Sequence, residues 1–476
     1  MSLPRLATAL LLALAVALAA AQGAPPAVPA GAHAAPAGAH AGSAGAAATR
    51  AQVAALLAAL TGHPALAAAD ALAAAAARRV DAVRAPLALS GQVDLRRLQV
   101  EPASDPLPPP FDDLFAVDEA SDTFSFRLVL RPFLFGDLAD LGDQRRIEAE
   151  RADLQAREAR AGLEAQAVQA ALGVWLADLA VGLAEEGLAL AELADTGARR
   201  RAEAGGASAV DVGRAELARR EAAAALADAR RQRDLAVARS ASLVGAARLD
   251  GPFDLTPVFG TSPDVLRATL DLALADVGTR NAERALLPTV QGGYTWLLDD
   301  GGSVTVGLES RTLQPAVSYA SGSAGGAGAG GGLDGLAPEG STPTVRGVFS
   351  VSVAWSFSPQ AFLEADALGL QRTAADAGLA AAIDRGNLTQ QALEAALLTS
   401  TARVELAAFE LELATLERDA AAARYAAGGA SELERLQAHL QWRGAVLGHA
   451  RARIDRLSTV LDSYTAYAVP LSEVLP

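Results

Sequence analysis

The chain of 476 residues contains no lysine and no cysteine, and only 4% of its residues are aromatic. The absence of lysine excludes a Walker A phosphate loop, a Schiff-base enzyme and a protein kinase. The absence of cysteine excludes disulfides, thiol catalysis, iron–sulfur clusters and cysteine-ligated zinc. A net charge of −15 lacks the basic footprint that a general nucleic-acid binder needs. Because alanine supplies much of the 51% hydrophobic content, long helices meeting along narrow seams fit the composition better than one thick core.

An export signal is expected at the N-terminus. Arg5 precedes an apolar run, and three alanines at 19–21 supply a small-residue cleavage site, so residues 1–21 are predicted to be a signal peptide. The run is shorter than the roughly 20 apolar residues of a membrane-spanning helix. Residues 22–48, rich in Ala, Pro and Gly, are expected to form a flexible leader. No later stretch reaches 18 uncharged apolar residues, so membrane insertion of the mature chain would need β-strands.

The rest of the chain is predicted to be a tandem duplication. Two blocks, 133–251 and 360–469, contain no proline and are rich in strong helix formers. Each block contains one Gly-Gly step in nearly the same local sequence, Ala-Gly-Gly-Ala-Ser, at Gly205 and again at Gly428. The predicted repeats are 49–250 and 251–470, and both follow the order helix, proline, strand, loop, strand, long helix, turn, helix.

Four segments alternate between apolar and polar residues with the period of a β-strand. They are 87–95, 124–130, 290–296 and 345–357. A water-soluble sheet that covers a core gives this alternation, and so does a lipid-facing barrel with a polar lumen. The alternation alone leaves the two interpretations open.

The lengths of the predicted helices favour a rod. Long helices are expected over 136–203 and 361–427, each roughly 100 Å long at 1.5 Å per residue. The shorter helices 207–247 with 262–287, and 430–465 with 50–85, have combined lengths that match one long helix each. Short helices stacked end to end would flank each long one, with the four strands at one end of the rod and both turns at the other.

With these features together, the chain resembles the TolC-like outer-membrane efflux proteins from about residue 50 to residue 470. The resemblance rests on the duplicated order, the helix–proline–strand junctions at Pro86 and Pro288, and the two glycine turns. In that family an acidic residue follows the turn glycine by six positions, and Asp211 and Glu434 stand there. The second glycine of each turn, where the family has a larger residue, departs from the pattern.

The resemblance implies a mainly α protein with membrane β-structure. It implies a homotrimer with a 12-stranded β-barrel, four strands from each subunit, continuous with a long periplasmic α-helical barrel. Its partners would be a periplasmic adaptor protein, an inner-membrane transporter and outer-membrane lipid. The loops 101–121 and 298–343 would face the exterior.

The resemblance also assigns candidate sites. The turns would form the periplasmic tip where the adaptor docks, with Gly205, Gly206, Ala207, Gly428, Gly429 and Ala430. The carboxylates Asp211 and Glu434 are predicted to line a periplasmic gate at this tip, with Arg214 and Arg435 as the nearest cationic partners. The alternative is that both carboxylates are only solvated first-turn residues of their helices, which the helix dipole favours. In a barrel, the large side chains of the alternating segments would face lipid: Phe124, Phe126, Tyr294, Trp296, Phe349 and Trp355.

No catalytic, cofactor or metal site is expected. The five histidines are scattered, and the formal Gly-x-Gly-x-x-Gly match at 326–331 lies in a Gly/Ala/Ser tract without a strand–helix unit. The predicted function is the outer-membrane exit duct of a tripartite efflux or type I secretion system, which exports substrates passively when an adaptor and pump open it. The alternative is a periplasm-spanning coiled-coil scaffold without a channel.

Overall fold

The computed structural model describes residues 43–97, 120–131, 134–298, 302–321, 347–355 and 358–475. The predicted signal peptide lies outside these residues and stays a prediction, as does the predicted exterior loop up to residue 119. The predicted flexible leader is too long, because its last residues from Ser43 onward already belong to a helix.

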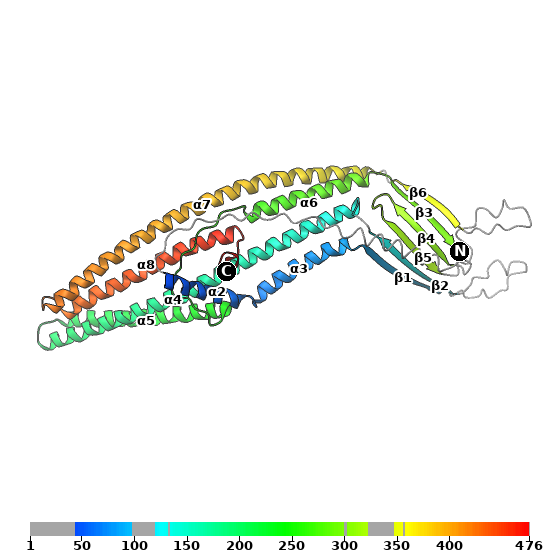
Figure 1. Cartoon of the computed structure of the whole chain (residues 1–476). Coiled ribbons are helices and arrows are strands. Elements are labelled where there is room, and N and C mark those ends of the chain that lie inside the picture. Colours follow the sequence, from blue (N-terminus) through cyan, green and yellow to red (C-terminus); the bar gives the residue numbers. More distant parts are fainter. Residues whose placement is uncertain are drawn as a thin grey trace, which may run out of the picture. The chain divides into compact units, whose positions relative to one another are not determined.

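The elements follow the predicted duplicated order (Figure 1). In the first half they are α2 (Ser43–Leu60), α3 (Pro64–Arg84), β1 (Leu87–Arg97), β2 (Ala120–Leu130), α4 (Asp137–Glu203) and α5 (Ala209–Val244). In the second half they are α6 (Pro263–Ala285), β3 (Thr289–Leu297), β4 (Ser303–Glu309), β5 (Pro315–Ser321), β6 (Gly347–Ala354), α7 (Pro359–Ala426), α8 (Glu432–Ala466) and α9 (Leu471–Val474).

The predicted helix 50–85 is wrong as a single element. The chain breaks at residues 61–63, and the helices on either side are bent by 66°. Gly62 has no side chain to pack, and Pro64 occupies the first turn of α3, where its missing N–H leaves no donor unsatisfied. His63 caps α3 by accepting a hydrogen bond at Nδ1 from the Ala65 N–H at 3.3 Å.

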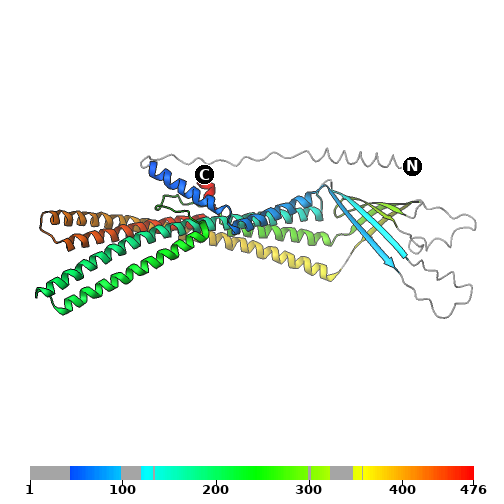
Figure 2. The ribbon, with the colours of Figure 1, turned by 90° about the horizontal axis from the view of Figure 1, so that it is seen from below.

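The chain divides into two compact units, and several helices have residues in both. The described parts of the sheet unit lie within Ala76–Glu148 and Ala273–Ala374. The helical unit takes its described residues from Ala35–Ala75, Ala149–Leu272 and Ala375–Pro476. Figure 2 shows the two long hairpins, α4–α5 and α7–α8, whose turns belong to the helical unit.

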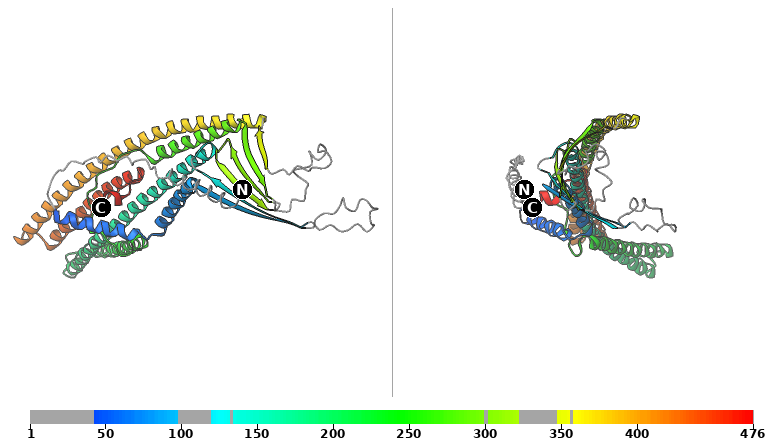
Figure 3. Two further views of the ribbon diagram at one scale, coloured as in Figure 1. Left: turned by 45° about the vertical axis from the view of Figure 1, so that its right-hand side comes forward. Right: turned by 90° about the vertical axis from the view of Figure 1, so that its right-hand side faces the viewer.

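The sheet unit contains one antiparallel sheet of six described strands in the order β1-β2-β5-β4-β3-β6 (Figure 3). The expected number of four strands in each subunit is therefore wrong. The two further strands, β4 and β5, lie inside the segment 298–343 that was predicted to be an exterior loop. They form a hairpin between β2 and β3, so all the predicted strands remain but the sheet is wider.

Buried charge joins two helix ends beside the sheet. Asp140, in the first turn of α4, is 1% exposed and forms an ion pair with Arg284 in the last turn of α6. Arg280 lies 3.6 Å away from the same carboxylate. Burial raises the pKa of Asp140, and the two arginines oppose that shift. Removal of either arginine would leave the buried Asp140 carboxylate with less compensating positive charge, which would lower the stability of the fold.

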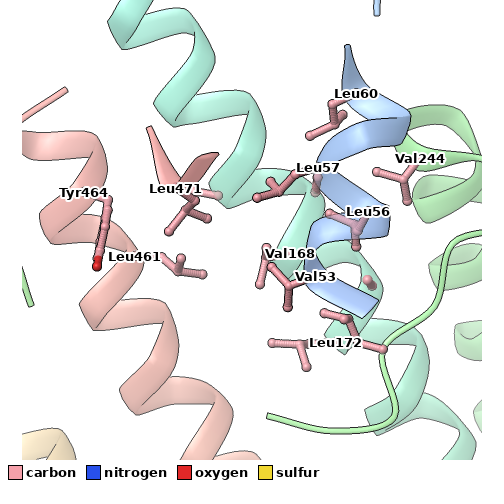
Figure 4. Packing of buried hydrophobic residues seen from close by; sticks show 14 of the residues in the cluster. Val53, Leu56, Leu57, Leu60, Val168, Leu172, Val244, Leu461, Tyr464 and Leu471 are labelled. Atoms are coloured by element: carbon pink, nitrogen blue, oxygen red, sulfur yellow. The ribbon is translucent and has the colours of Figure 1, made fainter. Parts of the chain in front are cut away.

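The core of the helical unit forms where α2 crosses α4 (Figure 4). Val53 and Leu56 of α2 are fully buried beside Val168 of α4 and Leu461 of α8. Among the described residues α4 also contains a window apolar enough to cross a membrane, and the bent pair α2–α3 passes the same test. In the single chain 28% of this window is buried, and α4 contributes Val168 and Leu172 to the core.

Candidate functional site

The pairing of the strands determines which side chains share a face of the sheet. Residues directly opposite each other in an antiparallel pair point to the same side. Tyr294 of β3 pairs with Phe349 of β6 and with Val306 of β4. Val306 in turn pairs with Val317 of β5, which pairs with Leu128 of β2. One apolar face therefore runs across the whole sheet without interruption.

That face contains the large residues of every strand. Its members with described side chains are Leu87, Leu89, Phe126, Leu128, Leu130, Val290, Tyr294, Trp296, Val304, Val306, Leu308, Val317, Tyr319, Phe349, Val351 and Val353. Several are strongly exposed in the single chain, with 71% for Phe349 and 64% for Val353. An exposed apolar surface of this extent is typical of a surface that contacts lipid or another protein.

The side chains on the opposite face are polar or small, and Val129, Leu297 and Val348 are its apolar exceptions. Thr295 and Thr305 face each other across β3 and β4, with their hydroxyl oxygens 2.9 Å apart. Gln291 donates a hydrogen bond to Glu309 across the same pair at 3.5 Å. The sheet therefore has one apolar side and one hydrogen-bonding side over its full width.

Most of the aromatic residues predicted to face lipid lie on the apolar face. Phe126, Tyr294, Trp296 and Phe349 do so, and the rings of Tyr294 and Trp296 meet edge to face at 4.6 Å. The backbone of Phe124 belongs to β2, but its side chain lies outside the described part. Trp355 follows the end of β6, and its indole N–H donates to the Leu286 carbonyl at 3.3 Å.

The two helical turns have the same hydrogen-bond pattern. Gly205 and Gly428 both have a φ of 73°, in the left-handed region that favours glycine. The N–H of Gly206 donates to the Arg201 carbonyl at 2.7 Å, and the N–H of Gly429 donates to the Arg424 carbonyl at 2.8 Å. This arrangement is a Schellman motif, which satisfies free carbonyls at the end of a helix.

A capping box opens the next helix at each turn. The Ser208 hydroxyl accepts from the Asp211 N–H at 3.2 Å, and the Asp211 carboxylate accepts from the Ser208 N–H at 3.0 Å. Ser431 and Glu434 make the equivalent bonds at 3.2 and 3.1 Å. Each turn is therefore closed on both sides by local hydrogen bonds. Both turns lie at the same end of the helical unit (Figures 1 and 2).

The predicted gate residues have local partners in the single chain. Hydrogen bonds from the Ser208 hydroxyl and backbone N–H lower the pKa of Asp211, and Arg214 adds a smaller effect in the same direction. Arg435 pairs with Glu432 at 3.9 Å, and its guanidinium lies 5.2 Å from the centre of the Tyr425 ring. The capping serines were missed in the sequence, although Ser-x-x-Asp and Ser-x-x-Glu directly after a glycine turn are their signature.

This fold, in which long helical hairpins join an antiparallel sheet, is that of the TolC-type outer-membrane channels. The CmeC outer membrane channel of Campylobacter jejuni is similar, with 13% identity, a TM-score of 0.57, and 89% of this chain and 86% of that chain covered. The open state of the MtrE outer membrane channel of Neisseria gonorrhoeae matches with 17% identity, a TM-score of 0.58 and 89% of each chain covered.

The outer membrane protein VceC of Vibrio cholerae matches with 19% identity and a TM-score of 0.55, over 88% of this chain and 96% of that chain. No family model matches the chain, and no curated protein sequence matches it significantly. The likeness therefore lies in the fold, which is the fold that the sequence resemblance predicted.

The two glycines of a turn are expected to differ in their tolerance of a side chain. Gly205→Ala places a β-carbon on a left-handed residue and should lower the free energy of unfolding by about 1–2 kcal/mol. Gly206→Ala should cost less, because its φ is ordinary and the new β-carbon would lie 3.4 Å from the Arg201 carbonyl oxygen. Denaturant unfolding of the purified variants measures both. Equal losses would contradict the Schellman assignment, and Gly428→Ala with Gly429→Ala repeats the comparison at the second turn.

Proposed function

We propose that the chain is the outer-membrane exit duct of a tripartite efflux or type I secretion system. The observation that carries this proposal is the continuous two-sided sheet, apolar on one face and polar on the other. A sheet with this pattern can bury its apolar face in lipid and enclose water with its polar face. The similarity in fold to outer membrane channels supports the same function.

The proposed channel works as a homotrimer in the outer membrane, with its helical part in the periplasm. Apolar side chains left exposed on α7 and α5 support assembly. On α7, Leu388 and Leu406 are separated by five helical turns, and Leu413 continues the same side; they are 64%, 60% and 50% exposed. On α5, Val210, Leu217 and Leu235 share one side and are likewise exposed. Helices with such stripes bury them against helices of other copies.

The two-sided sheet also favours a channel over the scaffold alternative. A periplasm-spanning scaffold needs the helical hairpins, but it has no use for a wide sheet with an exposed apolar face. Such a face in water would promote aggregation. The proposed duct catalyses no reaction and needs no cofactor, and the pump and adaptor supply the energy and the opening.

Lipid contact of the apolar face is tested by a pair of neighbouring substitutions. Val351→Arg places a charge on the apolar face and should destabilise the protein by roughly 2–4 kcal/mol if that site lies near the bilayer midplane. Ser352→Arg places the same charge on the polar face and should be tolerated. Folding into lipid vesicles followed by denaturant titration measures the difference. Equal tolerance of the two substitutions would rule out a membrane-spanning sheet.

The tip formed by the two turns is proposed to dock a periplasmic adaptor. Ala207 and Ala430 are half-buried between the glycines and the capping serines, so the surface there is compact and nearly free of side chains. Ala207→Trp with Ala430→Trp should leave the trimer intact but abolish co-purification of the adaptor from membranes of the native host. Ala223→Trp, at an exposed position in the middle of α5, is the control. Adaptor binding that survives the double substitution would make the turns plain hairpin connections.

The carboxylates of Asp211 and Glu434 are proposed to line the closed tip. In a trimer they would form six negative charges around a narrowing lumen, and rings of carboxylates favour cations. Planar-bilayer recording of the wild type should show conductance with cation selectivity and block by multivalent cations. Asp211→Asn with Glu434→Gln should weaken both, while the amide oxygens can still accept the capping hydrogen bonds. Glu221→Gln is the control for charge elsewhere on α5. Unchanged selectivity would leave the two carboxylates with a capping role only, and no conductance at all would contradict the channel.

A further inference from the structure

The hairpin β4–β5 occupies a place in the sheet that determines how wide a closed barrel would be. It separates β2 from β3, and it makes a full ladder with each of them. Six residues of β5 pair with β2, and seven residues of β4 pair with β3. The hairpin is therefore bonded on both sides, as interior strands are.

The turn of this hairpin is built into the junction between the sheet and the helices. The Arg311 carbonyl accepts from the Asp137 N–H at the start of α4, at 3.3 Å. The Arg311 guanidinium donates to the Ala285 carbonyl at the end of α6, at 3.5 Å. A β-carbon at Gly136 would lie 1.7 Å from the Arg311 carbonyl oxygen, so the chain needs a glycine where the turn rests. These contacts therefore hold the hairpin turn in a fixed position beside both helix ends.

The side chains of the hairpin have the same two-sided pattern as the other strands. Val304, Val306 and Leu308 lie on the apolar face, whereas Ser303 and Thr305 lie on the polar face. A segment folded into a water-filled lumen would have no reason to present valines on one side only. A wall strand between lipid and water requires that pattern.

The edges of the sheet need partners if the sheet lies in a bilayer. Each edge strand, β1 and β6, leaves a row of backbone N–H and C=O groups without a ladder partner in the described sheet. In hydrocarbon such groups must be satisfied, and closure into a barrel is the way β-structure achieves it. Adjacent strands alternate in direction across the six, so β1 and β6 run in opposite directions. The two edges can therefore form another antiparallel pair between two copies.

We propose that β1 of each copy pairs with β6 of the next, so that three copies close a barrel of eighteen strands instead of twelve. The inference rests on the trimer of the proposed function. Barrel diameter grows roughly linearly with strand number, so the membrane part would be about 1.5 times as wide as one of twelve strands. Barrels of 16–18 strands leave an aqueous channel, so a barrel of this width would be open to water through the membrane.

The chain has no cysteine of its own, so any disulfide in a variant must form between the cysteines that were introduced. Leu128→Cys with Val317→Cys joins directly opposed positions of β2 and β5, and it should form a disulfide within one chain. Leu128→Cys with Val306→Cys is the matched control. Its two positions are separated by two strand spacings, roughly 9–10 Å, beyond the reach of about 7 Å for a disulfide.

The edges are tested in the same way between copies. Leu89→Cys on β1 is combined in turn with Phe349→Cys, Val351→Cys and Val353→Cys on β6, and one of these pairs should give covalent trimers on denaturing gels. Each single cysteine variant is a control and should remain monomeric on the gel. Electron cryo-microscopy of the unmodified trimer in lipid nanodiscs counts the strands directly and does not depend on any variant folding.

Eighteen strands and an intrachain 128–317 disulfide would support the proposal. Conducting trimers with twelve wall strands and no 128–317 disulfide would overturn it, and would leave the proposed channel function standing. A protein that neither forms trimers nor conducts ions, with no disulfides between copies, would overturn the channel function together with this inference.

Discussion

The antiparallel register of the sheet is the constraint on which the proposed membrane part depends. Because side chains alternate with a period of two, a slip of one residue in any ladder would exchange the faces of every strand beyond it. The five observed ladders agree with one another, and they carry a single apolar face from Leu89 to Phe349. This consistency across strands far apart in the sequence is typical of a surface with a defined environment on each side.

The helical unit depends on a different kind of packing. Its buried cluster is localised where α2, α4, α5 and α8 meet, while much of the length of α7 stays exposed. Alanine-rich helices bury little apolar area for each residue, and the many Arg–carboxylate pairs on their surfaces add little stability. Long helices of this composition gain most of their stability from neighbouring helices, and the proposed trimer would supply part of that contact.

The sequence predicted the long helices and the four alternating strands because their signals are continuous and strong. The proline-free blocks became α4–α5 and α7–α8, and the turn glycines that end α4 and α7 have a left-handed conformation. The hairpin β4–β5 was missed because a segment with many glycines nearby was interpreted as a loop. Within it, Val304, Val306 and Leu308 alternate with polar or small residues, and that period-two signal was present. The break at 61–63 contains Gly62 and is followed by Pro64, and its His63 accepts a backbone hydrogen bond that composition does not reveal.

The contact between the hairpin turn and residue 136 limits how related chains can vary in evolution. The Arg311 carbonyl occupies the space of a β-carbon at residue 136, so the hairpin and that glycine are mutually dependent. A lineage that lost the hairpin would remove this clash, and only the left-handed φ of 58° would still favour glycine. A lineage with a larger residue there could not acquire the hairpin in this place. The residue just before the first long helix would therefore co-vary with the length of the segment between the third and last strands. In related sequences, a residue other than glycine at this position would then indicate a sheet without the hairpin.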